Sequence, residues 1–315
     1  MSVERLLDQV FARRGDRELC ADLYLPRNGP ALPALIVWIH GGGWRTGTRK
    51  SGPNLVLHFA QAGFAMASID YSSSADVVFP AQIEDVLAGI YWLKERASHF
   101  GYDGGRVGLW GSSSGGHLAA LAGLTDAEAF GPTAAGGGRV QAVVDGYGPT
   151  DLLKMDEQRD EERAPRDDPE SLILSPGART SDPDSRESAL FGGSLFRDPE
   201  LVARANPLTH VAANAPPFLI CHGLSDGAVP YSQSRLLYEK LKAAGGEVSL
   251  ALFEGLGHGF FNRDHVDDRG VRRVQFRRAR NCEETCDTRE VMVFGLVQEF
   301  FERHLGASAQ VGAIR

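Results

Sequence analysis

The stretch Val107-Gly-Leu-Trp-Gly-Ser-Ser-Ser-Gly-Gly-His-Leu-Ala119 decides how the rest of the chain is interpreted. Its apolar start predicts a buried strand, and the small residues at its end predict a closely packed helix. Between them lies Gly111-Ser-Ser113-Ser-Gly115, which fits the pattern G-x-S-x-G. A strand that passes into a helix through so tight a turn holds the central serine at strained dihedral angles, and glycine leaves room on either side. Ser113 is therefore the first candidate for a nucleophile.

Short apolar runs recur on both sides of this stretch, at residues 34–40, 64–69, 140–144, 218–221 and 248–253. Such runs predict strands that are buried on both faces. Residues 19–25 alternate ahead of Pro26, which predicts an antiparallel strand. Between the strands, helices are predicted from one-sided apolar spacing: Ile83, Val86, Leu87, Ile90, Leu93, and near the end Val293, Val297, Phe301. This alternation predicts an α/β protein with a mostly parallel sheet and helices on both faces.

Length and composition narrow the class of protein. A chain of 315 residues can bury a full core, and 43% hydrophobic and 23% charged residues are typical of a globular protein. The net charge of −8 argues against a nucleic-acid partner and against docking on anionic lipid. No stretch approaches the roughly 20 apolar residues of a membrane helix, and the start lacks the layout of a secretory signal. We therefore expect no membrane partner and a cytoplasmic location.

Two segments interrupt the rhythm of strands and helices. Residues 148–214 are polar and irregular, and we expect them to form a cap-like insertion over the site. Residues 263–289 carry a cluster of arginines followed by Cys282 and Cys286. We interpret both segments as decorations on one domain, residues 1–315, and the two cysteines as thiols on one helical turn. Two such ligands do not make a zinc site, so no metal is expected.

A serine hydroxyl needs a base to remove its proton, and the base needs a carboxylate to orient it. Nine histidines compete for the first role. His258 is the candidate because it lies in a glycine-rich loop directly after the last apolar run, at the carboxyl edge of the sheet. Asp226, in the loop after residues 218–221, is the candidate acid. Asp145 competes with it, because Asp145 ends the preceding strand and could reach the same histidine.

Donors for a developing oxyanion are expected from His40-Gly41-Gly42-Gly43-Trp44, straight after a predicted strand. Glycine amides can face a ligand without a Cβ in the way. Together with the amide of Ser114, which follows the nucleophile, Gly41 and Gly42 are predicted to form an oxyanion hole. Trp44 is predicted to line the substrate pocket. A phosphate cradle is disfavoured, because no G-x-x-x-x-G-K-[ST] or G-x-G-x-x-G pattern follows.

These stretches, with Asp70-Tyr71, Asp145-Gly-Tyr-Gly-Pro-Thr-Asp151, Pro216-Pro-Phe-Leu-Ile-Cys-His-Gly223 and Gly257-His-Gly-Phe260, carry a resemblance over residues 34–260. The chain resembles the hormone-sensitive-lipase-like and feruloyl-esterase-like branch of the α/β-hydrolase superfamily. The resemblance implies an eight-stranded, mostly parallel sheet, ester hydrolysis without a cofactor, and the triad Ser113, Asp226 and His258. The family commonly continues Asp-Tyr with Arg-Leu. Ser72-Ser73 stands there instead, so one structural ion pair is expected to be missing.

The sequence therefore predicts a serine carboxylester hydrolase that acts on small or short-chain acyl esters, with acetylated or feruloylated sugars as candidate substrates. The polar composition of the predicted cap, which lacks a long apolar face, is the reason for preferring short chains. An aryl formamidase of the formylkynurenine type is the alternative, since such enzymes share a His-Gly-Gly-x-Trp loop. A non-catalytic ligand receptor on the same fold is less favoured, because this chain keeps every element of the site. The sequence leaves a homo-oligomer open.

Overall fold

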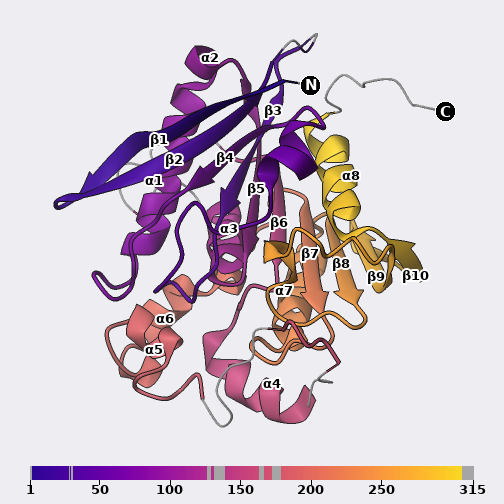
Figure 1. The fold of residues 1–315 in the computed structure, drawn as a ribbon. Coiled ribbons are helices and arrows are strands. Elements are labelled where there is room, and N and C mark those ends of the chain that lie inside the picture. Colours follow the sequence, from indigo (N-terminus) through magenta and orange to yellow (C-terminus); the bar gives the residue numbers. More distant parts are fainter. Residues whose placement is uncertain are drawn as a thin grey trace.

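A twisted sheet of ten strands runs through the computed structural model, which describes residues 2–27, 29, 31–125, 129–130, 139–162, 167–171 and 179–306. The strand order is β1-β2-β4-β3-β5-β6-β7-β8-β9-β10 (Figure 1). The six central strands are parallel to one another: β3 (Ala34–Ile39), β4 (Ala65–Ile69), β5 (Asp103–Ser112), β6 (Ala142–Gly146), β7 (Phe218–Gly223) and β8 (Val248–Phe253). All are buried except for the first residues of β5, as the continuous apolar runs predict.

Four antiparallel strands extend this centre, so that the expected eight strands become ten. β1 (Val3–Arg14) and β2 (Arg17–Pro26) extend one side, and β9 (Arg272–Arg280) and β10 (Glu283–Val291) extend the other. Most residues of β1 and β10 are exposed or half-buried. An edge strand that faces solvent needs no apolar run, which is why the hydrophobic pattern did not reveal these two strands.

The arginine-rich segment supplies β9 and β10. Asn281 (φ 51°) and Cys282 (φ 65°) form the two-residue turn between them, and a positive φ at both central positions is the requirement of a type I′ hairpin turn. Both cysteines are exposed, and Cys286 lies on β10. The interpretation of the two thiols as one helical turn is therefore wrong. Acidic partners balance the arginines: Arg277 pairs with Glu239 and Glu284.

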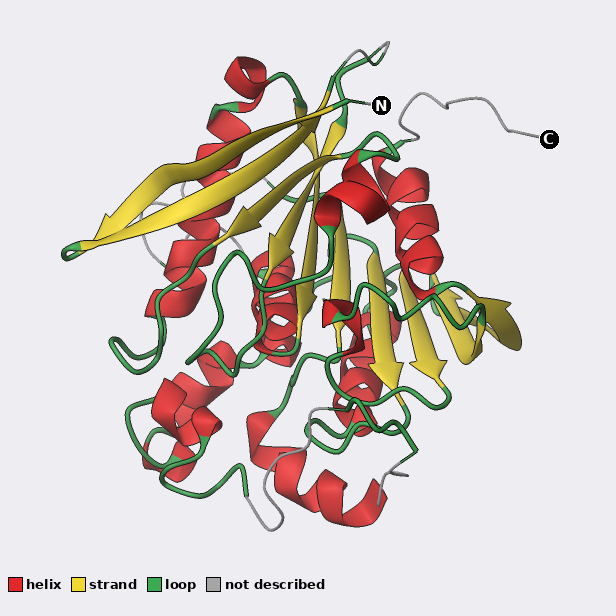
Figure 2. Cartoon of the chain, in the orientation of Figure 1, coloured by secondary structure: helices red, strands yellow, loops and turns green. Residues whose placement is uncertain are grey.

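Helices cover both faces of the sheet (Figure 2). On one face lie α1 (Ala81–Glu95), α2 (Ala97–Phe100), α3 (Ser114–Leu124) and α7 (Tyr231–Ala243), and on the other lie η1 (Val56–Ala60) and α8 (Val293–Leu305). Strand β3 shows how side chains are divided between the two layers. Leu35, Val37 and Ile39 join the cluster with α1, α3 and α7, whereas Ile36 and Trp38 join the cluster with α8. This alternation follows from the two-residue period of a strand.

The described residues between 148 and 205 lie beyond the carboxyl ends of the parallel strands, below the sheet in Figure 1. The chain then returns to the amino ends of the strands, where Arg139 donates to the Asn214 carbonyl. The whole segment 148–214 forms short helices: η3 (Leu152–Lys154), α4 (Met155–Glu162), α5 (Arg186–Leu190), η4 (Leu195–Arg197), α6 (Pro199–Ala205) and η5 (Pro207–His210). Residues 163–166 and 172–178 of the predicted cap lie outside the described residues. Ligands of open α/β sheets bind at the carboxyl end of the strands.

Asp70 has an ion-pair partner although the chain lacks the arginine that the resemblance led us to expect. Arg49 binds Asp70 at 2.7 Å and Asp22 at 2.8 Å, and it also contacts Asp8. Asp70 is therefore ion-paired in this chain, to an arginine that lies outside the Asp-Tyr motif. Arg49 ties β1, β2 and the end of β4 together. No helix among the described residues is both long enough and apolar enough to cross a membrane.

Candidate active site

Ser113 stands in the turn between β5 and α3, at φ 56° and ψ −122°. This strained turn requires the two glycines of the G-x-S-x-G pattern. A Cβ on Gly111 would lie 2.1 Å from the carbonyl oxygen of Gly115, and one on Gly115 would lie 2.1 Å from that of Ile39. The amide of Ser113 donates to the carbonyl of Gly146 on the neighbouring strand at 2.7 Å. The backbone thus fixes the direction in which the Ser113 hydroxyl points.

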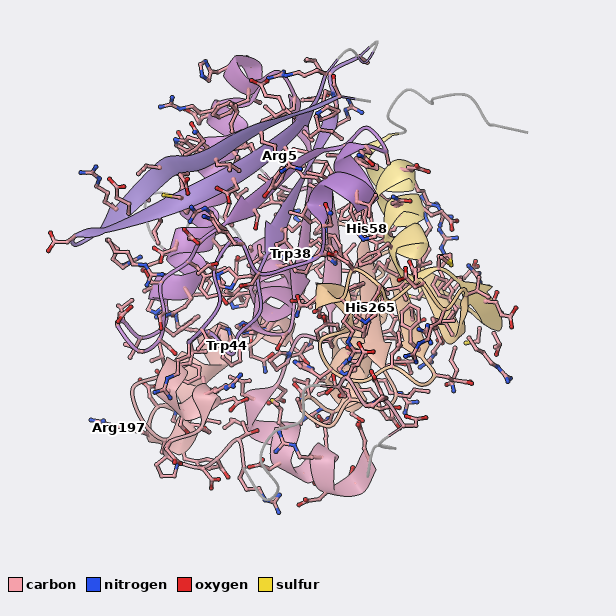
Figure 3. All side chains as sticks on the ribbon, in the orientation of Figure 1. Arg5, Trp38, Trp44, His58, Arg197 and His265 are labelled. Atoms are coloured by element: carbon pink, nitrogen blue, oxygen red, sulfur yellow. The ribbon has the colours of Figure 1, made fainter. Side chains whose placement is uncertain are left out.

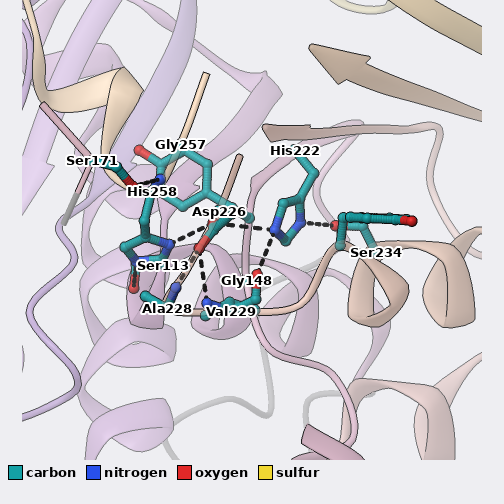
Figure 4. A network of polar contacts seen from close by, with 12 residues as sticks. Ser113, Gly148, Ser171, His222, Asp226, Ala228, Val229, Ser234, Gly257 and His258 are labelled. Carbon is teal, nitrogen blue, oxygen red and sulfur yellow. Dashed lines mark hydrogen bonds and ion pairs between the residues drawn. The ribbon is translucent and has the colours of Figure 1, made fainter. Parts of the chain in front are cut away.

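The structure joins the three predicted residues in one chain of hydrogen bonds (Figure 4). Ser113 Oγ lies 2.8 Å from His258 Nε2, and His258 Nδ1 lies 2.7 Å from Asp226 Oδ2. An ionised carboxylate can only accept, so Nδ1–H donates to Asp226 and the other ring nitrogen is free to accept the hydroxyl proton. Asp226 and His258 are buried. This arrangement can deprotonate Ser113 as it attacks an electrophile.

Asp226 is held by more than His258. Its Oδ1 accepts from the amides of Ala228 and Val229, each at 2.8 Å, and its Oδ2 lies 3.2 Å from His222 Nε2. Burial opposes the charged form, but the charge of His258 and the hydrogen bonds from both histidines outweigh it and lower the pKa of Asp226. The carboxylate is therefore ionised throughout the neutral range.

His222 is a further member of this network, outside the predicted triad (Figure 4). Its Nδ1 lies 2.7 Å from the Ser234 hydroxyl, and its Nε2 lies 3.0 Å from the Val229 carbonyl. Burial disfavours the charged imidazole, yet the contact with Asp226 outweighs this and raises the pKa of His222. The short spacing between His222 and Asp226 is the only signal in the sequence that could have indicated the contact.

The competing acid, Asp145, has another partner. Its Oδ1 accepts from the Gly148 amide at 3.0 Å, and its Oδ2 has no hydrogen-bond partner among the described residues. Burial raises the pKa of Asp145 to about 6. His258 therefore binds Asp226 and not Asp145. Asp145 lies against the first turn of α3, where a Cβ on Gly116 would lie 2.4 Å from its Oδ1.

The predicted oxyanion residues lie beside Ser113 and line the same cavity. Gly42 (φ 126°) and Gly43 (φ 60°) adopt backbone angles that favour glycine. A Cβ on Gly41 would lie 2.8 Å from the Ser112 carbonyl, so this loop lies directly against the turn that carries Ser113. A cavity of about 180 Å³ opens here, and its lining consists of Gly41, Gly42, Gly43, Trp44, Ser113, Ser114, Pro149, Arg186, Glu187, Ala228, Val229, His258 and Asn262.

Trp44 belongs to this lining but is almost completely buried (2% exposed). Its indole N–H donates to His117 Nδ1 at 3.2 Å, and His117 Nε2 lies 2.7 Å from the Ala205 carbonyl. Burial lowers the pKa of His117 to about 4, which keeps the imidazole neutral and able to accept from the indole. Figure 3 shows Trp44 at the carboxyl end of the sheet, near the α5–α6 segment. Trp44 thus joins the glycine loop to α3 and to the end of α6.

Charged side chains at the cavity come from the predicted cap. Arg186 and Glu187 stand in the first turn of α5, and the Arg186 side chain lies across the backbone of Gly43. Burial raises the pKa of Glu187. Among the described residues, no group of three or more His, Cys, Asp or Glu side chains is arranged to hold a metal ion.

Comparisons with known proteins find a family model and two esterases that resemble this chain. The BD-FAE family model matches residues 21–241. Esterase LipC of Mycobacterium tuberculosis is 32% identical over 76% of this chain and 56% of its own length. The isoprenylcysteine alpha-carbonyl methylesterase ICME of Arabidopsis thaliana is 29% identical over 75% of this chain and 53% of its own length. The chain thus spans about half the length of these curated relatives.

Solved structures share the fold. A truncated form of a carbohydrate esterase from gut microbiota superimposes with a TM-score of 0.67 and 27% identity, over 85% of this chain and 94% of the other. An esterase of the planctomycete Thermogutta terrifontis covers 99% of this chain and 95% of its own, with a TM-score of 0.68 and 23% identity. The chain therefore has the α/β-hydrolase fold that its motifs predicted.

Proposed function

The chain belongs to the BD-FAE family, and from this membership and its site we propose that it is a serine carboxylester hydrolase. The observation that carries the proposal is the hydrogen-bonded chain from Ser113 through His258 to Asp226, which opens on a cavity beside a glycine loop. The names of its relatives, LipC an esterase and ICME a methylesterase, support the same class of reaction.

In the proposed reaction Ser113 Oγ attacks the ester carbonyl while His258 Nε2 accepts the hydroxyl proton. Asp226 orients the ring and stabilises its positive charge. The amides of Ser114 and of Gly41 and Gly42 would donate to the oxyanion that forms on the carbonyl oxygen. His258 then gives its proton to the leaving alcohol. In the second step His258 accepts a proton from the water that attacks the acyl group on Ser113, and it returns this proton to Ser113 Oγ as the acid is released.

For the substrate we propose small esters of two kinds: esters with acyl chains from acetyl to butyryl, and acetylated or feruloylated sugars. The cavity of about 180 Å³ is smaller than the roughly 300–1,000 Å³ of pockets for drug-sized ligands. Trp44, Pro149, Ala228 and Val229 supply apolar surface inside this volume, and Arg186, Glu187 and Asn262 supply polar atoms. Each buried CH₂ contributes about 0.8 kcal/mol only where apolar surface receives it, so the part of a long chain that does not fit into the cavity gains little.

The test combines a substrate screen with one substitution. Hydrolysis would be measured for p-nitrophenyl esters from acetyl to decanoyl, for methyl ferulate, for acetylated xylan and for formylkynurenine. We expect turnover to fall with acyl length, and we expect Ser113→Ala to be folded with turnover near background. A serine-directed phosphonate should leave one adduct, on Ser113.

Three outcomes would contradict the proposal. A Ser113→Ala sample that keeps more than a few per cent of the activity would remove Ser113 as the nucleophile. Efficiency that rises steadily up to decanoyl would overturn the short-chain assignment. Turnover of formylkynurenine well above that of every ester would favour the aryl formamidase instead.

A further inference from the structure

We propose that Asp168 and Ser171, two side chains from the predicted cap, are positioning residues that hold the loop of His258 in place for catalysis. The inference rests on the proposed function, because it concerns the base of that reaction. His258 lies in the loop that follows β8, and this loop contacts residues 167–171. Neither Asp168 nor Ser171 lines the cavity that contains Ser113, so any effect of theirs on the reaction has to pass through the loop.

Two consecutive amides of the loop donate to these two side chains. The N–H of Gly257 donates to Asp168 Oδ2 at 2.7 Å. The N–H of His258 donates to Ser171 Oγ at 2.8 Å (Figure 4). His258 is therefore held at three points: its backbone by Ser171, and its ring by Asp226 and Ser113. Such fixed hydrogen bonds outside the reacting groups preserve the geometry of a site.

Arg263 also binds both Asp168 and the backbone of His258. Its Nη1 lies 3.1 and 2.9 Å from the two oxygens of Asp168, and its Nη2 donates to the His258 carbonyl at 3.4 Å. Asp168 and Arg263 are both largely buried, so water does not readily replace the contacts that they make. Burial opposes the charge of Asp168, but the bonds from Gly257 and Arg263 outweigh it and lower the pKa of that carboxyl.

The fit between the two segments is close. A Cβ on Gly257 would lie 2.1 Å from Ser171 Oγ and 2.3 Å from Ser171 Cβ, so only glycine leaves room for Ser171. The same segment reaches the loop of Asp226, because the Ser225 hydroxyl donates to the carboxylate of Asp167. Residues 167–171 thus connect the loop of the base with the loop of the acid. A displacement of about 1 Å at a catalytic group can lower the rate about 100-fold, so this connection bears directly on turnover.

The experiment compares Ser171→Ala and Asp168→Ala with two controls. Ser171→Thr keeps the hydroxyl that accepts from His258. Glu170→Gln changes a neighbour on the same segment whose side chain contacts His265, Arg263 and Arg269 but neither loop amide. We expect the two alanine variants to lower kcat about 10- to 100-fold with KM changed less than about 3-fold. Ser171→Thr should recover most of that loss, and Glu170→Gln should resemble the wild type.

A second measurement does not depend on turnover. Hydrogen–deuterium exchange of the peptide that covers residues 254–260 should become faster in Ser171→Ala and Asp168→Ala than in Glu170→Gln. If Asp168→Ala does not fold, Ser171→Ala decides the matter alone. Folded alanine variants with wild-type kcat and wild-type exchange would overturn the inference, and so would a loss confined to KM. Failure of the proposed function is a separate result: a wild-type protein that hydrolyses no ester, with exchange responding as expected.

Discussion

At the residue scale, Asp226 and Asp145 are two buried aspartates of which only one contacts His258, the proposed base. Asp226 accepts four hydrogen bonds, among them one from His258, whereas Asp145 accepts one from a backbone amide. We expect Asp226→Asn to lower turnover about 10⁴-fold, because the amide favours the wrong tautomer of the histidine. Asp145→Asn should lower it far less. Steady-state kinetics on both variants gives the ranking, and the reverse order would move the acid to β6.

A substitution of Asp145 should change the stability of the protein rather than its turnover. The pKa of Asp145 is raised to about 6 from 3.8 by burial, so between about pH 4 and 6 the folded protein keeps a proton that the unfolded chain loses. Stability then falls as the pH rises through that window. Relative to the wild type, we expect Asp145→Asn to gain about 2–3 kcal/mol in the free energy of unfolding between pH 4 and pH 8.

Urea unfolding at the two pH values measures this gain. Asp76→Asn, which removes an exposed carboxylate, is the matched control. A pH-independent difference between Asp145→Asn and the wild type would show that Asp145 does not titrate in this window.

The residues that hold the site were harder to predict than the residues that form it. Ser113, Asp226 and His258 each follow a recognisable strand, so their placement at one edge of the sheet could be derived from the sequence. Asp168 and Ser171 lie in a polar segment that has no hydrophobic periodicity. Asp168 binds Gly257, which is 89 residues away in the chain, and Ser171 binds His258, which is 87 residues away. No local signal encodes such a contact, because it depends on how the cap folds back.

At the scale of elements, the contact of α8 with β5 depends on one missing side chain. A Cβ on Gly108 would lie 2.5 Å from Cε1 of the buried Phe301 ring and 3.1 Å from Leu305 Cδ1. We expect Gly108→Ala to lower the free energy of unfolding by about 1–3 kcal/mol, because the helix must shift or the ring must leave its rotamer.

Thermal and denaturant unfolding would test this. The control is Gly295→Ala within α8, where a Cβ would meet only Met292 and alanine favours the helix by up to about 1 kcal/mol. A Gly108→Ala protein as stable as the wild type would show that the packing of α8 tolerates the added atom.

The parallel strands of the sheet could be predicted from the sequence, but the edge strand β10 could not. The parallel strands are buried on both faces and carry continuous apolar runs, so their number and order along the chain could be predicted. β10 cannot be found in this way, because its sequence Glu283-Glu-Thr-Cys-Asp-Thr-Arg-Glu-Val291 faces solvent over most of its length. What holds it is backbone pairing with β9 and ion pairs such as Arg277 with Glu284, and neither leaves an apolar pattern.

For the whole molecule, the proposed mechanism uses only side chains and backbone amides. We expect EDTA to leave ester turnover unchanged, because His258 and Asp226 supply the base and its orientation without a Lewis acid. Turnover would be compared before and after dialysis against the chelator, with a phosphonate-treated sample as the control for complete loss. Reactivation of a chelated sample by zinc would contradict the mechanism.

The hydrogen bond between Ser113 and His258 joins residues 145 positions apart in the chain. During synthesis Ser113 leaves the ribosome long before His258 has been added to the chain. The turn around Ser113 can form as soon as β5 and α3 are present, but β8 must pair with β7 before the loop after it can bring His258 to the serine. Contacts of such long range form only after the loop-closure entropy has been overcome. The rate at which ester cleavage recovers after dilution from denaturant therefore reports when β8 has paired with β7, whichever route the chain takes to that point.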